Sequence, residues 1–126
     1  NGKLLFNARS ETADAKALFR DGMRHRRCLV PAAHYFEWEK RGKDRIKYAI
    51  RPGGAAVMYM AGIYRLENGA PVFTILTREP AAAISFIHDR MPVILPKEAA
   101  GDWLNIRYDA GDVLTGAVQD VECWLA

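Results

Sequence analysis

Cysteine is scarce in this sequence of 126 residues, which contains only Cys28 and Cys123. Two thiols without a tight spacing predict neither a disulfide framework nor a metal-binding knuckle, and a reducing, cytoplasmic setting fits them best. No apolar run reaches the roughly 20 residues that a membrane-spanning helix needs, and no secretory signal opens the chain. We therefore expect a soluble, cytoplasmic protein with no membrane partner.

The signatures of several enzyme classes are also missing. The sequence has no Cys-x-x-Cys pair, no His-Glu-x-x-His helix and no glycine-rich phosphate loop, so no metal site is predicted. Ser10 is interpreted as a helix cap and Ser85 falls inside a predicted helix, so neither is a strong nucleophile candidate. Cys28 lies in an apolar run, which favours an inert core thiol. A thiol peptidase would need Cys28 to be exposed with a lowered pKa.

The composition predicts a globular protein, because 50% of the residues are hydrophobic and 26% are charged. This length is enough for one domain with its own core. The formal net charge of +3 gives a mild preference for anionic partners but does not by itself indicate nucleic-acid binding. The chain starts at Asn1 rather than Met, so we expect residues 1–126 to form one domain that lacks an N-terminal segment.

Apolar runs separated by turn signals follow one another along most of the chain. They predict strands at residues 3–6, 28–30, 35–39, 47–50, 57–64, 72–77, 93–95 and 121–125. Helical segments are predicted at 13–19, 81–86, 96 to about 105, and 109–116. Asn68-Gly69 predicts a hairpin, and Pro31 should lie at a sheet edge. These elements predict an α+β domain, mostly antiparallel, in which a curled sheet or open barrel carries peripheral helices.

The ends and faces of the helices can also be predicted. Ser10 or Thr12 should cap the first helix, because a side-chain oxygen there can accept an unpaired backbone N–H. Asp21-Gly22 should end that helix. Leu18 in the first helix and Leu104 in the helix after Pro96 are expected to face the core.

The chain is organised around Phe36-Glu37-Trp38, a carboxylate between two large aromatic rings. Side chains alternate along a strand, so Phe36 and Trp38 should point to one face and Glu37 to the other. Glu37 then shares a face with Tyr35 and Glu39, where a partly desolvated carboxylate would be suited to proton transfer. Taken alone, this stretch favours an exposed Glu on a half-buried strand, and the other motifs decide its interpretation.

Polar side chains stand at the ends of three predicted strands: Asn7 with Arg9, Glu37, and His88-Asp89-Arg90. Active sites draw on such strand ends and loops. Asn7 and Arg9 share a face and suit an oxygen-rich ligand such as phosphate, and His88 could act as an acid or a base near neutral pH. Each cluster alone has a structural explanation, as a strand end or a cap, so only their combination indicates a site.

The order and spacing of four motifs resemble the SRAP family, the SOS response-associated peptidases or abasic site processing proteins. The matching segments are Asn7-Ala8-Arg9-Ser10-Glu11-Thr12, Arg27-Cys28-Leu29-Val30-Pro31 leading into Phe36-Glu37-Trp38, Thr77, and His88-Asp89-Arg90-Met91-Pro92. The resemblance implies a protein that captures abasic sites in single-stranded DNA. In this family the initiator Met is removed, and the exposed N-terminal cysteine condenses with the ring-opened sugar aldehyde to give a thiazolidine crosslink.

The resemblance implies a catalytic role for three residues of this sequence. Glu37 would shuttle protons beside the N-terminal amine, and His88 would assist opening of the sugar ring. Asn7 would orient the cysteine and the sugar. No cofactor is implied, because one carboxylate and one imidazole suffice for imine chemistry.

The resemblance also implies four DNA-binding residues. Arg9 and Arg90 would hold phosphates, Trp38 would line the DNA channel, and Thr77 would lie near the site. Binding through the backbone and by stacking should tolerate any base sequence. In a bacterium the protein would be associated with the nucleoid.

The sequence departs from the family at its start, because the family begins Met-Cys-Gly-Arg-Phe and this chain does not. Neither Cys28 nor Cys123 matches the family nucleophile, so this chain is expected to hold only the acid-base half of the site. Core surface left uncovered would favour a dimer. Two alternatives stay open: a non-catalytic module that binds single-stranded DNA, and a thiol peptidase that uses Cys28.

Overall fold

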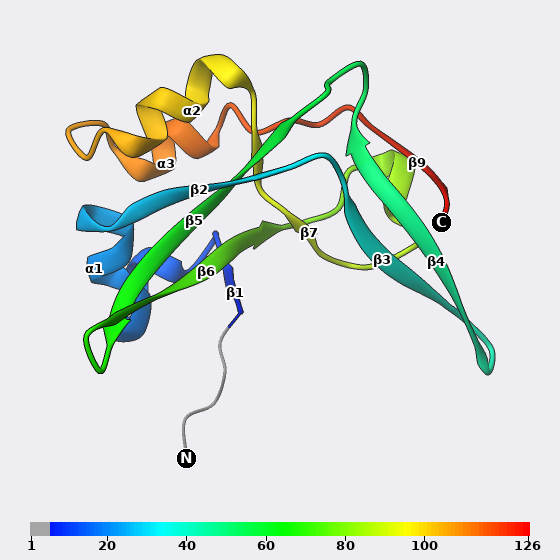
Figure 1. The fold of residues 1–126 in the computed structure, drawn as a ribbon, viewed down its shortest axis with the longest axis horizontal. Helices are drawn as coiled ribbons and strands as arrows, with labels where there is room; N and C mark the ends of the chain where they lie inside the picture. Colours follow the sequence, from blue (N-terminus) through cyan, green and yellow to red (C-terminus); the bar gives the residue numbers. More distant parts are fainter. Residues whose placement is uncertain (1–5) are drawn as a thin grey trace.

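A computed structural model gives the fold of residues 6–126 as two sheets with helices at the periphery (Figure 1). The larger sheet has the order β1-β6-β5-β2, with β7 paired to β6 and β8 to β5, and the smaller sheet has the order β3-β4-β9. The strands of the larger sheet are β1 (Asn7–Arg9), β2 (Arg27–Ala32), β5 (Met58–Glu67), β6 (Ala70–Arg78), β7 (Met91–Pro92) and β8 (Ile94–Leu95). The smaller sheet contains β3 (Tyr35–Arg41), β4 (Asp44–Pro52) and β9 (Val121–Leu125).

The strand pairing is antiparallel throughout the described residues except between β1 and β6, which are parallel. The β3–β4 hairpin extends away from the larger sheet (Figure 1). The prediction of a mostly antiparallel α+β domain is confirmed, and the described strands form a curled, open arrangement rather than a closed barrel.

Turn chemistry fixes the register of the hairpins. Asn68 and Gly69 both have positive φ, 50° and 80°, between β5 and β6. Two such residues form the turn whose twist matches antiparallel strands, so the predicted Asn-Gly hairpin is confirmed. Pro31 lies in β2, the edge strand of the larger sheet, where its missing N–H is tolerated.

Three α-helices and two 3-10 turns complete the described chain. They are η1 (Ala13–Ala15), α1 (Ala17–His25), η2 (Ala82–Ile84), α2 (Lys97–Leu104) and α3 (Ala110–Leu114). Figure 1 shows all three α-helices at the β2–β5 end of the molecule. Within residues 6–126, no helix is both long enough and apolar enough to cross a membrane.

Trp103 of α2 is the centre of the core between the helices and the larger sheet. Its side chain is fully buried, and its indole N–H donates to the carbonyls of Cys28 at 3.0 Å and Gly62 at 3.1 Å. The Arg27 guanidinium lies 5.0 Å from the centre of the indole ring. These contacts hold α2 against β2 and β5, and they satisfy the one polar atom that burial of the ring would otherwise leave unpaired.

A second core cluster lies between the two sheets and η2. It contains Ile50, Met58, Met60, Ala81, Ile84, Ile87, Met91, Ile94 and Val121. Partly buried side chains of both sheets pack against it, including Tyr35, Tyr48 and Ile75. This inter-sheet core is the structural frame of the candidate site.

The helix predictions need correction. Residues 13–15 form a 3-10 turn, and the α-helix runs through Gly22 to His25 instead of ending there. Gly22 lies inside this helix, next to Ile63 of β5. A Cβ added there would be 3.0 Å from Ile63 Cβ, so glycine serves close packing rather than helix termination. Leu18 and Leu104 are exposed, although both were expected to face the core.

The predicted caps are also wrong. Thr12 makes no side-chain capping bond, and the Ser10 hydroxyl donates to Glu11 instead. The helix predicted at 81–86 is a 3-10 turn at Ala82–Ile84. The strand predicted at 3–6 falls mostly outside the described residues, and Phe6 is not in a strand.

Candidate functional site

Arg90 anchors the loop that carries His88. Its Nη2 and Nη1 each lie 2.9 Å from an oxygen of the Glu11 carboxylate. Nη2 also donates to the Thr77 carbonyl at 2.8 Å, and Nε donates to Thr77 Oγ1 at 3.3 Å. A guanidinium engaged on both edges is held in one orientation, so Arg90 ties this loop to the end of β6 and to the segment after β1. The phosphate contact implied for Arg90 stays a prediction.

Glu11 is the acidic centre of this cluster. Its hydrogen bond from Arg90 outweighs partial burial, and together with a bond from Ser10 it lowers the pKa of Glu11 from 4.5 to about 2. Arg9 Nε lies 3.8 Å from the same carboxylate, and the Arg9 side chain is largely exposed. Glu11 therefore stays ionised at neutral pH and brings two arginines to one place.

His88 is oriented by the backbone of the same loop. Its Nδ1 accepts the N–H of Arg90 at 3.1 Å and lies 3.3 Å from the Asp89 carboxylate. Nδ1 also lies 3.3 Å from the Arg90 carbonyl oxygen, which would accept a bond from Nδ1–H in the other tautomer. His88 thus has one nitrogen fixed by the protein and a second available to exchange a proton with a ligand.

A pocket of about 460 Å³ brings His88 and Trp38 together. It lies between the middle of β3 and the loop after η2, and it is lined by Trp38, Lys40, Ser85, Phe86, Ile87, His88 and Asp89. An aromatic ring, an imidazole and a lysine around one opening can receive a small polar ligand attached to an anionic chain.

Glu37 lies on the half-buried face of β3, as the alternation predicts. Phe36 and Trp38 are exposed on the other face, whereas Tyr35, Glu37 and Glu39 are partly buried. Glu37 Oε1 accepts the N–H of Trp38 at 3.1 Å, and Tyr48 is the cross-strand partner of Glu37. The Tyr35 hydroxyl on this face is buried without a partner, and burial, with a smaller contribution from Glu37, raises the Tyr35 pKa.

Asn7, Arg9 and Thr77 lie on adjacent strands in register. Asn7 is opposite Ile75, Arg9 is opposite Thr77, and Thr77 is opposite Pro92 on β7. Side chains opposite each other point to the same face of a sheet, so Asn7 shares a face with Ile75. Ile75 packs on the inter-sheet core.

Each of the three catalytic candidates has a neighbour that belongs to the inter-sheet core or packs against it. Asn7 lies on the Ile75 side, Glu37 lies on the face of Tyr35, and His88 follows the buried Ile87. The convergence of Asn7, Glu37 and His88 on one pocket, with their polar atoms within roughly 10 Å of one another, stays a prediction.

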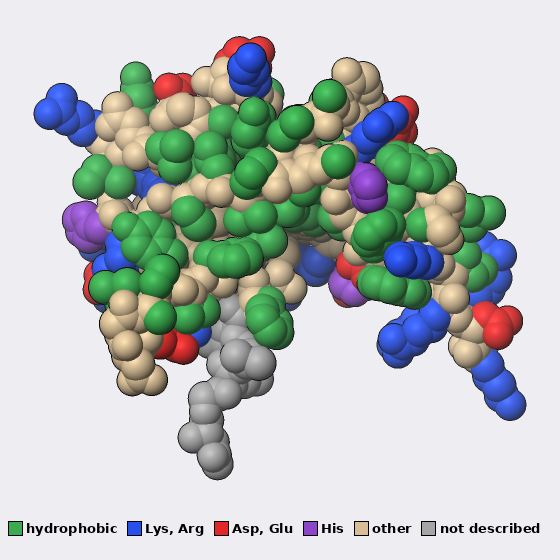
Figure 2. Space-filling view, viewed as in Figure 1, with side chains coloured by type: hydrophobic (Ala, Val, Ile, Leu, Met, Phe, Trp, Pro, Cys, Tyr) green, Lys and Arg blue, Asp and Glu red, His purple; other side chains and the backbone are tan. Residues whose placement is uncertain are grey.

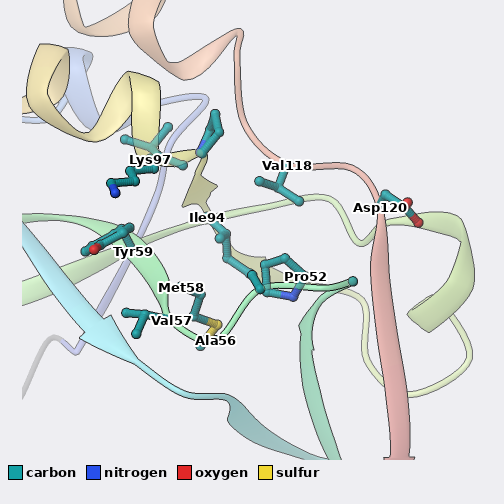
Figure 3. A pocket seen from close by; sticks show the side chains of 13 residues that line it. Pro52, Ala56, Val57, Met58, Tyr59, Ile94, Lys97, Val118 and Asp120 are labelled. Atoms are coloured by element: carbon teal, nitrogen blue, oxygen red, sulfur yellow. The ribbon is translucent and has the colours of Figure 1, made fainter.

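A larger cavity, of about 620 Å³, lies elsewhere, between the β4–β5 connection and the start of α2 (Figure 3). Its walls are mainly apolar side chains such as Met58 and Ile94, with Lys97 and Asp120 among the polar ones (Figure 3). The candidate residues do not line it. Size alone would favour this cavity, but the presence of His88 and Asp89 in its lining favours the pocket beside β3.

Cys28 does not have the environment of a nucleophile. It is partly buried in β2, and burial raises the pKa of its thiol above 9.0. A reactive cysteine needs the opposite shift. Among residues 6–126, no three His, Cys, Asp or Glu side chains come together as a metal site requires.

An apolar groove lies on the exposed face of the larger sheet. Figure 2 shows hydrophobic side chains gathered over the region of β2, β5 and β6. The groove is lined by Cys28, Leu29, Val30, Pro31, Tyr64, Pro71 and Phe73. The dimer expected from exposed core surface stays a prediction.

Glu11 is the residue of this site to which the sequence analysis gave no role. It lies inside a motif singled out there, but its partner Arg90 is 79 positions away. The sequence shows only that Glu11 lies two positions after Arg9 near an expected strand end. It does not identify Arg90 as the partner of Glu11.

Comparison with known proteins places this fold and these motifs in context. The SOS response associated peptidase (SRAP) family matches residues 1–123. Abasic site processing protein YoaM of Bacillus subtilis is 36% identical over 119 residues, covering 90% of this chain and 52% of that protein. Abasic site processing protein YedK of Escherichia coli is 33% identical over 104 residues, covering 79% and 47%. The chain spans about half the length of these relatives.

Two solved structures share the fold. A protein from Bacteroides thetaiotaomicron matches with a TM-score of 0.83 at 29% identity, covering 94% of this chain and 57% of that one. A protein from Bordetella bronchiseptica matches with a TM-score of 0.79 at 26% identity, covering 95% and 64%. Because the family match includes every candidate residue described above, the chain belongs to the SOS response associated peptidase (SRAP) family.

Proposed function

We propose that this protein acts in DNA repair on abasic sites of single-stranded DNA. The observation that carries the proposal is the pocket that His88 shares with Trp38. The relatives named abasic site processing proteins support the same substrate. The protein would act where DNA lies, in the cytoplasm and at the nucleoid if it is bacterial.

The reaction is the capture of the sugar aldehyde by an N-terminal cysteine. The cysteine amine adds to the aldehyde carbon and gives a carbinolamine, which loses water to form an imine. The thiol then adds to the imine carbon and closes a thiazolidine ring. The amine must be neutral to attack, so a base and an acid at the site set the rate.

Glu37 and His88 divide the proton transfers. Glu37 takes the proton that the attacking amine loses and returns it to the hydroxyl that leaves as water. His88, held at Nδ1 by its own loop, assists opening of the sugar ring, in which the ring oxygen gains a proton and the anomeric hydroxyl loses one. Asn7 orients the sugar through its side-chain amide.

Contacts between arginine side chains and the DNA phosphates would bring the strand to this pocket. Arg9 is exposed and supplies a phosphate contact. Arg90, already bound to Glu11 and Thr77, adds positive charge and holds the His88 loop in place. Trp38 stacks on a base beside the abasic position.

The thiol peptidase alternative is disfavoured by the raised pKa of Cys28. The non-catalytic alternative, a module that binds single-stranded DNA, predicts binding without a crosslink. One assay separates these functions.

The assay is a denaturing gel of protein mixed with an abasic oligonucleotide, with and without borohydride. A form of the protein that begins with the family's N-terminal cysteine should give a heat-stable adduct without borohydride. The chain that begins at Asn1 has an amine but no thiol beside it, so it should give at most an imine that borohydride traps.

An oligonucleotide with a reduced abasic site, which has no aldehyde, is the control and should give no adduct. A heat-stable adduct from the Asn1 chain without borohydride would show that another residue is the nucleophile. Binding without any adduct from the cysteine form would favour the non-catalytic module.

A further inference from the structure

The outer face of the smaller sheet carries a row of aromatic side chains, of which only Trp38 has been given a role above. His34 precedes β3, Phe36 and Trp38 point outward from β3, and Trp124 points outward from β9. We call these four residues the aromatic row. Phe36, Trp38 and Trp124 are 43%, 43% and 39% exposed, which is high for rings of this size.

The rings of the aromatic row contact one another. The His34 ring centre lies 4.9 Å from that of Phe36 and 5.8 Å from that of Trp124, both edge to face. Ala49 of β4 lies between Phe36 and Trp124 in the register and is almost fully buried beneath them. The His34 ring therefore links Phe36 of β3 with Trp124 of β9.

Two cations lie directly on the aromatic row. Lys47 Nζ is 4.1 Å from the Phe36 ring centre and 5.6 Å from that of Trp38. The Arg51 guanidinium is 5.0 Å from the Trp124 ring centre and is paired with Glu122 at 2.8 Å. Figure 2 shows hydrophobic, basic and histidine side chains mixed over the region of β3, β4 and β9.

We propose that the aromatic row is a stacking surface for the bases of single-stranded nucleic acid, which continues the strand path away from Trp38. This inference rests on the proposed function, which places a strand at Trp38. Exposed rings with interleaved cations are the combination that binds single strands without sequence preference, because every base has a π-face and every nucleotide a negative charge.

The cations decide between the possible occupants of this face. An apolar protein segment would bury Lys47 against its rings without an anion to compensate. A strand of nucleic acid supplies a phosphate for Lys47 and Arg51 at the same time as a base for Phe36 and Trp124.

The test is fluorescence anisotropy of a labelled oligothymidine without abasic sites. Phe36→Leu and Trp124→Leu keep an apolar cover over Ala49 but remove the ring, so each should weaken binding roughly 5- to 150-fold. The salt dependence of binding should stay unchanged in both. Lys47→Ala should instead lower the salt slope by about 0.7, one phosphate contact on a single strand.

Phe73→Leu is the matched control, because Phe73 is 52% exposed but lies on β6, outside the aromatic row. It should bind like the parent chain. Circular dichroism and thermal unfolding establish that each variant is folded.

Three results would overturn the inference. If both Leu variants bind normally while Arg9→Ala binds weakly, the proposed function stands and the aromatic row has no part in it. If the parent chain binds no single-stranded DNA, the proposed function fails and this inference fails with it. If Phe36→Leu changes only the oligomeric state seen by light scattering, the face belongs to a second copy of the chain.

Discussion

Arg90 and Glu11 form a two-pronged ion pair across 79 positions of sequence, with both nitrogen–oxygen distances at 2.9 Å. The Arg90 side chain is only 17% exposed, so the pair is partly shielded from solvent. Because Arg90 also binds Thr77, the pair fixes the His88 loop relative to β1 and β6.

The stability of the protein should depend on the charge of Glu11. Its pKa is lowered from 4.5 to about 2 in the folded state, so its contribution is complete above about pH 5 and is lost as the pH falls through 2. Glu11→Gln should lower the free energy of unfolding at pH 7 by about 1 kcal/mol, a value reduced for screening because the Glu11 side chain is 44% exposed. Urea unfolding at several pH values measures the difference, which should shrink between pH 4.5 and 2.

A double-mutant cycle gives the control for this pair. In an Arg90→Gln background, Glu11→Gln should change the stability little. A stability difference that stays constant down to pH 2 would mean that the Glu11 charge is not its source.

DNA binding should depend on Arg9 and Arg90 through charge. Replacing either with Ala should weaken single-strand binding and lower the salt slope by about 0.7, the value for one phosphate contact. Arg90→Ala should cost more affinity, because it leaves the Glu11 carboxylate facing the strand. Anisotropy titrations over a range of salt concentrations measure both effects.

Arg107→Ala is the control, since Arg107 is exposed after α2 and belongs neither to β1 nor to the His88 loop. An unchanged salt slope in both the Arg9 and the Arg90 variants would place the DNA path elsewhere.

The rate of crosslink formation with the abasic site should depend on Glu37. In the form that begins with cysteine, Glu37→Ala should slow crosslink formation by about 10²- to 10⁴-fold, the effect of a lost general acid-base. Glu39→Ala removes a carboxylate from the same face of β3 and should leave the rate nearly unchanged. Single-turnover gels give the rates. Equal rates for the Glu37 variant and the parent would remove Glu37 from the mechanism.

Two glycines in helices should respond in opposite ways to substitution by alanine. Gly101→Ala in α2 meets nothing within 4 Å and should stabilise the protein by about 0.5–1 kcal/mol. Gly22→Ala in α1 would place a Cβ 3.0 Å from Ile63 Cβ and should destabilise it by about 1–2 kcal/mol. Urea unfolding of both variants measures the difference. Stabilisation by both would show that α1 lies further from β5.

Strand positions were largely predictable because their signals are local. The strand at Val121–Leu125 was predicted with its observed ends, and Asn68-Gly69 gave the hairpin. The alternation of Phe36, Glu37 and Trp38 also matches the observed exposure. The helices were predicted less well, because Gly22 resembles a helix end in sequence and becomes a packing contact only against Ile63.

The sequence by itself determined the α+β class and the alternation on β3, because periodicity and turn chemistry act over a few residues. The set of candidate residues came from the resemblance of its motifs to a family. Only the tertiary structure decided that Glu11 binds Arg90, that His88 shares a pocket with Trp38, and that Trp124 contacts His34. These contacts join residues 50 to 90 positions apart, and their register depends on how two sheets pack around one core. A pattern that extends over a few residues cannot predict contacts between residues so far apart in the sequence.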